Sequence, residues 1–525
     1  MVFALCVVDF HHIRGPEIQH WISPDGDDKS ALFPNLPFQA LPDGSHLFAE
    51  LFTQFTLLYD YENDFSPAPL DPDYDFSTVN TLFGCGCIRQ IQSLELAALA
   101  DLTRSVVQKA VVVISRQPLL NTIKDKLRIV TNSYFDQHDF LDVLVLQSLL
   151  HDLLLVHRST VDNTDYYMNL NLRMFLLRFK QRFLVVFKLL LLEKRVMIYS
   201  SRDDLIDFEL NLISLVPNLM GNLQDSGSPR LHNLSVKERL RKPSSLNTND
   251  RTSMLRFYGL PLQIFNRGGF FYPYISLQQL DDLSNEQSKF YIIGTSNQLL
   301  RDRKATLCDV IINLDTNQLE FQDPALEAVL GLTVNDKRFA DDLVSQTAKN
   351  FHRLTTQYLG SDDYIRCQLE EYLLSLLLTA KCNSYMSQYG IPPPGFEYND
   401  RSGNLALFNE QFVTTWMATQ NYAIWNATAD DFVFNFLEPQ HVGIETETVG
   451  FLDRISMSKF DIVEAQRAEA AVERKEKPDR SPGSDMETLT ESASAVNLEE
   501  AKVEPATATA ATFIESWSNW AFKGT

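Results

Sequence analysis

The chain has 525 residues, 45% of them hydrophobic and 22% charged, so most of it can bury a core. Its length allows about two to four domains. The formal net charge of -22 at pH 7 argues against general nucleic-acid binding, because contacts to phosphate need a basic field. The six scattered cysteines are typical of reduced thiols in the cytosol, and we expect no disulfide framework.

The N-terminal part predicts a small antiparallel sheet followed by helices. Arg14-Gly15-Pro16 is a strong turn signal, and residues 36–44 predict a loop held by two prolines and a glycine. Strand-like stretches occupy residues 2–10, 17–22, 51–59, 79–91 and 109–115. We therefore expect an α+β domain over residues 1–118. A helical connector follows over residues 119–168, where apolar residues recur with a helical period.

The stretch from Asn169 to Val216 has the pattern of an α/β unit. From Leu172 to Leu191 the apolar residues recur at helical spacing, and Lys188 falls mostly off their stripe. Residues 196–199 are apolar throughout, which predicts a strand covered on both faces before a further helix. The apolar run is shorter than the roughly 20 residues of a membrane span, so we expect a buried helix and no transmembrane segment.

The remaining divisions follow from changes in composition. Residues 218–253 are rich in Gly, Ser, Pro and Asn and predict a flexible insertion within a central domain of residues 169–320. Helical patterns dominate residues 321–465. Residues 466–512 have almost no large apolar side chain and predict a disordered acidic tail, and a short amphipathic aromatic segment of residues 513–525 ends the chain.

The search for reactive chemistry finds no catalytic signature, so we expect no covalent catalyst, no cofactor and no metal. Cys85-Gly86-Cys87 is at most half of a metal site, and no second pair has matching spacing. The same stretch lacks the third glycine of a dinucleotide-binding loop. Ser244 and Ser245 follow two basic residues and are candidate phosphorylation sites, with an unmodified solvated loop as the equal alternative.

The last residues carry an aromatic face that a disordered tail does not need. Trp is favoured at a membrane interface or in a partner's groove, so this face predicts one of those contacts. The alternative is that the segment docks back on its own domain. The residues of this face are Phe513, Ile514, Trp517, Trp520 and Phe522.

Several motifs resemble a known family when they are taken in order. Residues 187–196, followed by a Ser-Ser turn, are similar to the central motif of DENN domains. Further stretches narrow the resemblance to the AVL-nine branch of the late secretory pathway, and they run from about residue 3 to residue 435. These stretches are residues 8–12, 14–17, 36–38, 40–44, 261–265, 273–281, 293–297, 322–324 and 336–341, with Trp416 and Asn421-Tyr422.

The resemblance implies a longin-like N-terminal domain, a central three-layer α/β DENN domain and a helical downstream DENN part. It also implies exocytic traffic from the Golgi to the plasma membrane. Because DENN modules commonly act as guanine-nucleotide exchange factors, it further implies a Rab GTPase as partner. An exchange factor works by binding and needs no reactive side chain, so this function agrees with the absence of a catalytic signature.

Pro42-Asp43-Gly44 is the best candidate among the loops for contact with such a partner, and a turn that merely fixes the first domain is the alternative. We expect a cytoplasmic protein associated peripherally with Golgi, secretory-vesicle or endosomal membranes. Two other functions stay open: a membrane-associated trafficking scaffold without exchange activity, and, as the weakest hypothesis, a hydrolase on the α/β core.

Overall fold

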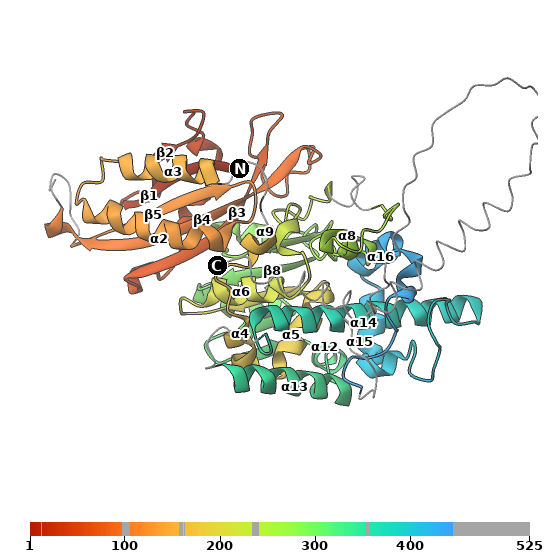
Figure 1. Ribbon diagram of the computed structural model, residues 1–525. Helices are drawn as coiled ribbons and strands as arrows, with labels where there is room; N and C mark the ends of the chain where they lie inside the picture. The colour runs from red at the N-terminus through yellow and green to blue at the C-terminus, as the bar shows by residue number, and fades with distance from the viewer. Residues whose placement is uncertain are drawn as a thin grey trace, which may run out of the picture.

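The structure is a computed structural model, and it describes residues 1–11, 13–96, 105–156, 161, 163–233, 241–351 and 358–444. It contains two five-stranded sheets, each covered by helices, and a group of helices that follows them (Figure 1). The predicted mixed α/β class is therefore confirmed. The tail predicted to be disordered, residues 466–512, and the aromatic segment of residues 513–525 lie outside the described residues.

The N-terminal sheet is antiparallel throughout, in the order β2-β1-β5-β4-β3. Its strands agree with the predicted stretches and are β1 (Val2–His11), β2 (Gly15–Ile22), β3 (Glu50–Asp60), β4 (Val79–Gln92) and β5 (Val106–Ser115). One face packs under α2 (Leu120–Asp136) and α3 (Leu144–Val156), as Figure 1 shows. The other face is covered by α1 (Leu36–Ala40).

Helix α1 corrects one sequence prediction, because it lies inside the stretch that was expected to be a loop. Pro37 stands in the first turn of this helix, where its missing N–H group costs no hydrogen bond. Leu36 and Ala40 are fully buried in the core of this face. A proline that begins a short helix leaves the same sequence signal as a proline in a loop, so burial decided the outcome.

The central sheet is parallel apart from one edge strand, and its order is β10-β9-β6-β8-β7. Its strands are β6 (Arg195–Tyr199), β7 (Gly269–Tyr272), β8 (Phe290–Thr295), β9 (Val310–Asn313) and β10 (Gln318–Phe321). Along β6, Val196 and Ile198 face one hydrophobic core, and Met197 and Tyr199 face another. The prediction of a strand covered on both faces is confirmed.

Helices on both faces make the central unit a three-layer arrangement. The large core on one face includes α4 (Leu172–Phe179), α5 (Arg182–Leu191) and α6 (Leu205–Ser214). The smaller core on the other face includes side chains of α9 (Leu280–Ser284), α10 (Gln298–Asp302) and α11 (Lys304–Leu307). Helix α5 feeds directly into β6, and its apolar side chains other than the partly buried Val185 are buried, as predicted for this stretch.

The helix expected between Leu172 and Leu191 is in fact two helices. Lys180 separates α4 from α5 and has a φ of 48° and a ψ of -136°. Lys188, which was expected mostly off the apolar stripe, is completely buried. The apolar stripe continues across the break, so the spacing of the apolar residues did not predict that the helix is divided.

Downstream helices pack beside the central sheet. They are α8 (Arg251–Phe257), α12 (Pro324–Val329), α13 (Val334–Asn350), α14 (Asp362–Tyr389), α15 (Glu410–Met417) and α16 (Gln420–Thr428). Their buried faces belong to the same large core as α4 and α5. Within the described ranges, no helix is both long enough and apolar enough to cross a bilayer.

The expected flexible insertion of residues 218–253 is wrong for its first part. Residues 218–233 pack against both sheets, and Ser226, Ser228 and Leu231 are fully buried. We call residues 224–233 the strap. The small residues of this segment allow close approach, and its polar residues form hydrogen bonds. A segment whose composition is typical of a flexible loop is therefore packed between two units.

Candidate partner-binding groove

Pro42, Asp43 and Gly44 form a tight turn at the carboxyl ends of two central strands. The N–H group of Ser45 donates to the carbonyl oxygen of Pro42 at 3.1 Å, and Gly44 has a φ of 81°. A turn that needs a positive φ at this position favours glycine. Pro42 is buried, whereas Asp43 is exposed at the surface.

The Asp43 turn is bonded to the central unit by three contacts. The N–H group of Asp43 donates to the Tyr274 hydroxyl at 3.0 Å, and the Ser296 hydroxyl donates to the Asp43 carbonyl oxygen at 3.0 Å. The Asn297 amide donates to the Asp43 carboxylate at 2.5 Å. Tyr274 follows β7, and Ser296 and Asn297 follow β8. This geometry makes the turn a joint between the two sheets.

A groove of about 490 Å³ lies beside this joint and is shared by both units. The N-terminal unit contributes the β1–β2 hairpin and the segment around the turn, and the central unit contributes the loop after Tyr274. The lining residues are Phe10, Pro16, Phe38, Leu41, Pro42, Asp43, Gly44, Ser45, His46, Gln108, Ser276, Leu277 and Gln278. His46 and Leu47 are exposed at this place, with 73% of Leu47 accessible.

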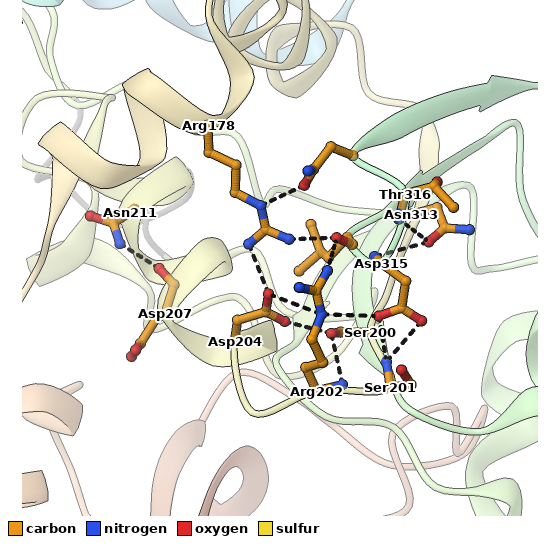
Figure 2. Close-up of polar contacts among 12 residues, drawn as sticks. Arg178, Ser200, Ser201, Arg202, Asp204, Asp207, Asn211, Asn313, Asp315 and Thr316 are labelled. Atoms are coloured by element: carbon orange, nitrogen blue, oxygen red, sulfur yellow. Dashed lines mark hydrogen bonds and ion pairs between the residues drawn. The ribbon is translucent and has the colours of Figure 1, made fainter. Parts of the chain in front are cut away.

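The other half of the same sheet edge is filled by a polar cluster, which Figure 2 shows. Arg178 donates to the Asp204 carboxylate at 2.8 Å, and the Ser200 hydroxyl donates to the other Asp204 oxygen at 2.5 Å. Arg202 donates to the Leu314 carbonyl oxygen at 2.6 Å. These residues come from the end of α4, the loop after β6 and the loop after β9.

A second acidic residue completes this cluster. The N–H group of Ser201 donates to the Asp315 carboxylate at 3.1 Å, and Arg202 lies 3.5 Å from the same carboxylate. Open α/β sheets that bind small ligands do so outside the carboxyl ends of their strands. Here that edge holds the chain's own side chains at β6 and β9 and the Asp43 turn at β7 and β8.

Sequence reasoning missed a buried ionic cluster that joins the central and downstream helices. Lys188 of α5 lies 2.6 Å from the Asp336 carboxylate at the start of α13, and both side chains are 0% exposed. The Tyr372 hydroxyl donates to Asp336 at 2.7 Å, and His441 Nε2 lies 3.1 Å from it. Burial raises the pKa of Asp336, but the hydrogen bonds from His441 and Lys188 and the charge of Lys188 outweigh it and hold this pKa well below its usual range. The single charge within the apolar run 183–192 was the available signal.

Glu193 makes a comparable joint at the corner before β6. Its carboxylate accepts from the N–H group of Asn421 at 2.8 Å and from that of Gln420 at 3.1 Å, at the start of α16. The Asn266 amide donates to Glu193 at 2.9 Å, and Trp416 Nε1 donates to Asn421 at 2.9 Å. A carboxylate at a helix N-terminus is favourably placed. Glu193, Trp416 and Asn421 were quoted above as family motifs, and they meet here at one structural joint.

The cysteines and serines singled out in the sequence lie elsewhere. Cys85 and Cys87 are buried on β4, and burial raises the pKa of each thiol to about 12. Among the described residues, no group of three or more His, Cys, Asp or Glu side chains is placed to hold a metal ion. Ser244 and Ser245 are exposed on an irregular segment before α8. The tail residues Phe513 to Phe522 lie outside the described ranges.

The fold and these contacts define a two-sheet α/β protein with a groove shared by its two sheets and a sheet edge closed by its own side chains. The family model "Transport protein Avl9" matches residues 2–380. The chain is 42% identical over 487 residues to "Late secretory pathway protein AVL9" of Saccharomyces cerevisiae, covering 88% of this chain and 63% of that protein. It is 37% identical over 465 residues to "Late secretory pathway protein avl9" of Schizosaccharomyces pombe, covering 87% of this chain and 93% of that protein. The chain therefore belongs to the Avl9 family.

Proposed function

We propose that this chain regulates vesicle traffic in the late secretory pathway by binding a Rab-type small GTPase and accelerating its release of nucleotide. In this proposal the N-terminal unit is the longin-like domain, the central unit is the DENN domain, and the helices after residue 320 are the downstream DENN part. The names of the two yeast relatives support the pathway. The chain spans 63% of the budding-yeast protein, so the activity of that whole protein is carried over only as part of this proposal.

The groove is the observation that carries the proposal. Exchange requires a surface that favours the nucleotide-free form of the GTPase, because a factor that binds both forms equally shifts no population. Such a surface has to keep its shape while the GTPase changes, and the groove here is fixed by the Asp43 joint to Tyr274, Ser296 and Asn297. Exposed His46 and Leu47 beside the joint are available to an incoming loop.

Release of fluorescent GDP from a panel of Rab proteins tests this function with the full chain. We expect faster release for at least one Rab and a stable complex of the chain with that Rab when nucleotide is removed. Unchanged release for all members, without any nucleotide-free complex, would contradict exchange activity. Binding without faster release would instead support the trafficking scaffold.

A pair of matched variants tests the groove itself. His46→Ala with Leu47→Ser removes two exposed side chains at the groove, and we expect at least about tenfold slower exchange, as for loss of a partly buried anchor. His151→Ala with Leu144→Ser removes the same side-chain types from α3, where Leu144 is 66% exposed. An equal loss of exchange rate in both variants, or no loss in either, would contradict a role for the groove in exchange.

The proposal includes a cytoplasmic location with peripheral attachment to Golgi, secretory-vesicle or endosomal membranes, and it includes no nucleic acid and no cofactor. We also propose that an aromatic face in the last residues contacts a membrane or a partner protein. Its residues are Phe513, Ile514, Trp517, Trp520 and Phe522. Ser244 and Ser245 remain proposed phosphorylation sites. Mass spectrometry of the chain isolated from cells tests the serines, and deletion of residues 513–525 tests the aromatic face by vesicle flotation.

A further inference from the structure

The distal end of α14 projects from the downstream helices. In Figure 1 this helix runs past α15 and α16 to the edge of the molecule. Its C-terminus is closed by Gly390, which has a φ of 70° and whose N–H group donates to the Met386 carbonyl oxygen at 2.9 Å. Three successive prolines, residues 392–394, then turn the chain back.

Two contacts hold the projecting part to the rest of the fold, and we use them to define its bounds. The Asn383 amide donates to the carbonyl oxygen of Gly403 at 3.2 Å, and this bond joins the two ends of the projecting segment. Farther along, the rings of Phe396 and Phe434 lie 5.5 Å apart between centroids. Residues 384–402 are therefore one supported protrusion, and we call its leading part, residues 384–396, the α14 tip.

The α14 tip has no charged side chain, and it exposes large apolar side chains beside the polar Ser387 and Gln388. The exposed charged residues Glu397, Asp400 and Arg401 lie in the returning part of the protrusion, outside the tip. Tyr389 is 57% exposed, Ile391 is 59% exposed, and the flanking prolines 392 and 394 are exposed as well. The rings of Tyr385 and Tyr389 lie 4.6 Å apart between centroids. No Asp, Glu, Lys, Arg or His occurs from residue 382 to residue 396.

This composition matches a lipid interface better than a charged partner. Tyrosine places an apolar ring and a polar hydroxyl across the boundary between acyl chains and head groups. A protein with a net charge of -22 is repelled by anionic surfaces, and an uncharged projecting tip is the part that can approach a bilayer with the least repulsion. Prolines and the paired ends hold the apolar side chains outward, so little conformational entropy is lost on insertion.

We propose that the α14 tip is a membrane-contact site that inserts Tyr389 and Ile391 into the interface of a zwitterionic bilayer. The attraction is hydrophobic, so binding should not weaken at higher salt and should fall when anionic lipid is added. This site belongs to the folded body, is separate from the aromatic face of the tail, and does not depend on GTPase binding.

A fluorescent probe at the tip tests insertion directly. In the full chain, Ile391→Cys is labelled with an environment-sensitive dye and mixed with phosphatidylcholine vesicles. We expect a blue shift, higher intensity and protection from a water-soluble quencher. Ile129→Cys on α2, whose natural side chain is 66% exposed, is the matched control and should show none of these changes. An unchanged spectrum at residue 391, or equal changes at both positions, would overturn the proposal.

Vesicle flotation gives the strength of the contact and separates it from the tail. Tyr389→Asn with Ile391→Asn should weaken partition of the full chain at least about tenfold, because the variant loses both of the apolar side chains that enter the interface. The loss should persist when Trp517→Ser and Trp520→Ser are also present, whereas Ile129→Asn should have no effect. Undiminished flotation of the tip variant, with the same circular dichroism as the natural chain, would contradict the site. A natural chain that does not bind vesicles, together with a tip variant that loses binding to a protein partner, would contradict it as well.

Discussion

Lys188 and Glu209 are both completely buried, but their surroundings differ. Lys188 has Asp336 at 2.6 Å and the Phe408 carbonyl oxygen at 3.0 Å. Neither carboxyl oxygen of Glu209 has a hydrogen-bond partner among the described residues. Burial therefore raises the pKa of Glu209 well above its ordinary value of 4.5, whereas the partners of Asp336 keep that carboxyl ionised.

Loss of the Lys188 charge should destabilise the chain. Lys188→Met keeps the length of the side chain but leaves the Asp336 carboxylate with one charged partner fewer inside the core. Because breaking a buried pair leaves an uncompensated charge, we expect a loss of about 3 kcal/mol in the free energy of unfolding, measured with urea. Lys337→Met, at an exposed neighbouring position, should change it by less than about 0.5 kcal/mol. Equal stability of the two variants would contradict this role for Lys188.

Glu209 gives the stability a pH dependence of known sign. Above its unfolded pKa the unfolded state releases a proton that the folded state keeps, so stability falls as pH rises toward the folded pKa of Glu209. Glu209→Gln should remove up to about 1.4 kcal/mol of this loss of stability per pH unit, over the range from about pH 5 up to the folded pKa of Glu209. Urea unfolding at several pH values measures this. Parallel pH curves for the variant and the natural chain would show that Glu209 is already ionised in the folded state.

At the scale of the element, the break between α4 and α5 positions two arginines at the edge of the central sheet, where the polar cluster lies. Arg178 in the last turn of α4 reaches Asp204, and Arg182 at the start of α5 donates to the Asn317 carbonyl oxygen at 2.6 Å. Lys180 has a positive φ, which L residues rarely adopt and which glycine adopts readily. The contacts on either side hold this residue in a conformation that its own type disfavours.

Replacement of Lys180 by glycine should therefore stabilise the chain. Glycine adopts this φ and ψ without a clash of its Cβ atom, so Lys180→Gly should raise the free energy of unfolding by about 1 kcal/mol. Lys180→Ala is the control, because it removes the charge and keeps the Cβ atom. A stabilisation by alanine as large as that by glycine would assign the effect to charge instead of backbone strain.

At the scale of the whole molecule, the two sheets are fastened on two sides. The Asp43 turn is one joint, and the strap is the other. Thr81 of β4 donates to the Gln224 carbonyl oxygen at 2.7 Å, and the N–H group of Gly227 donates to Thr81 at 3.0 Å. The N–H group of Phe271 in β7 donates to the Ser226 carbonyl oxygen at 2.8 Å. The strap thus lies between β4 of the first sheet and β7 of the second.

A side chain at Gly227 should loosen this joint. A Cβ atom there would lie 2.7 Å from Thr81 Oγ1 and 2.9 Å from Thr81 Cγ2, so Gly227→Val must push the strap away from β4. We expect one calorimetric unfolding transition in the natural chain and two in the variant, the N-terminal unit unfolding first. Ala31→Val is the control, because Ala31 is an exposed residue of the N-terminal unit where a larger side chain can extend into solvent. A single transition in both variants would mean that the strap does not couple the sheets.

The sequence by itself determined the fold class and the family. Strand and helix periods follow local burial, so the five N-terminal strands and the buried strand β6 were predictable from spacing. The order of the family motifs was equally readable, because it depends on residue identity alone.

Only the tertiary structure decided what fastens the parts together. Asp43 meets Asn297, Lys188 meets Asp336 and Glu193 meets Asn421 across separations of 254, 148 and 228 residues. No local period encodes such distant pairs. The strap shows the same point, because its Gly- and Ser-rich composition allows either a free loop or close packing between two sheets. Which of these it adopts depends on whether a partner surface lies within reach, and that surface exists only when both sheets are folded.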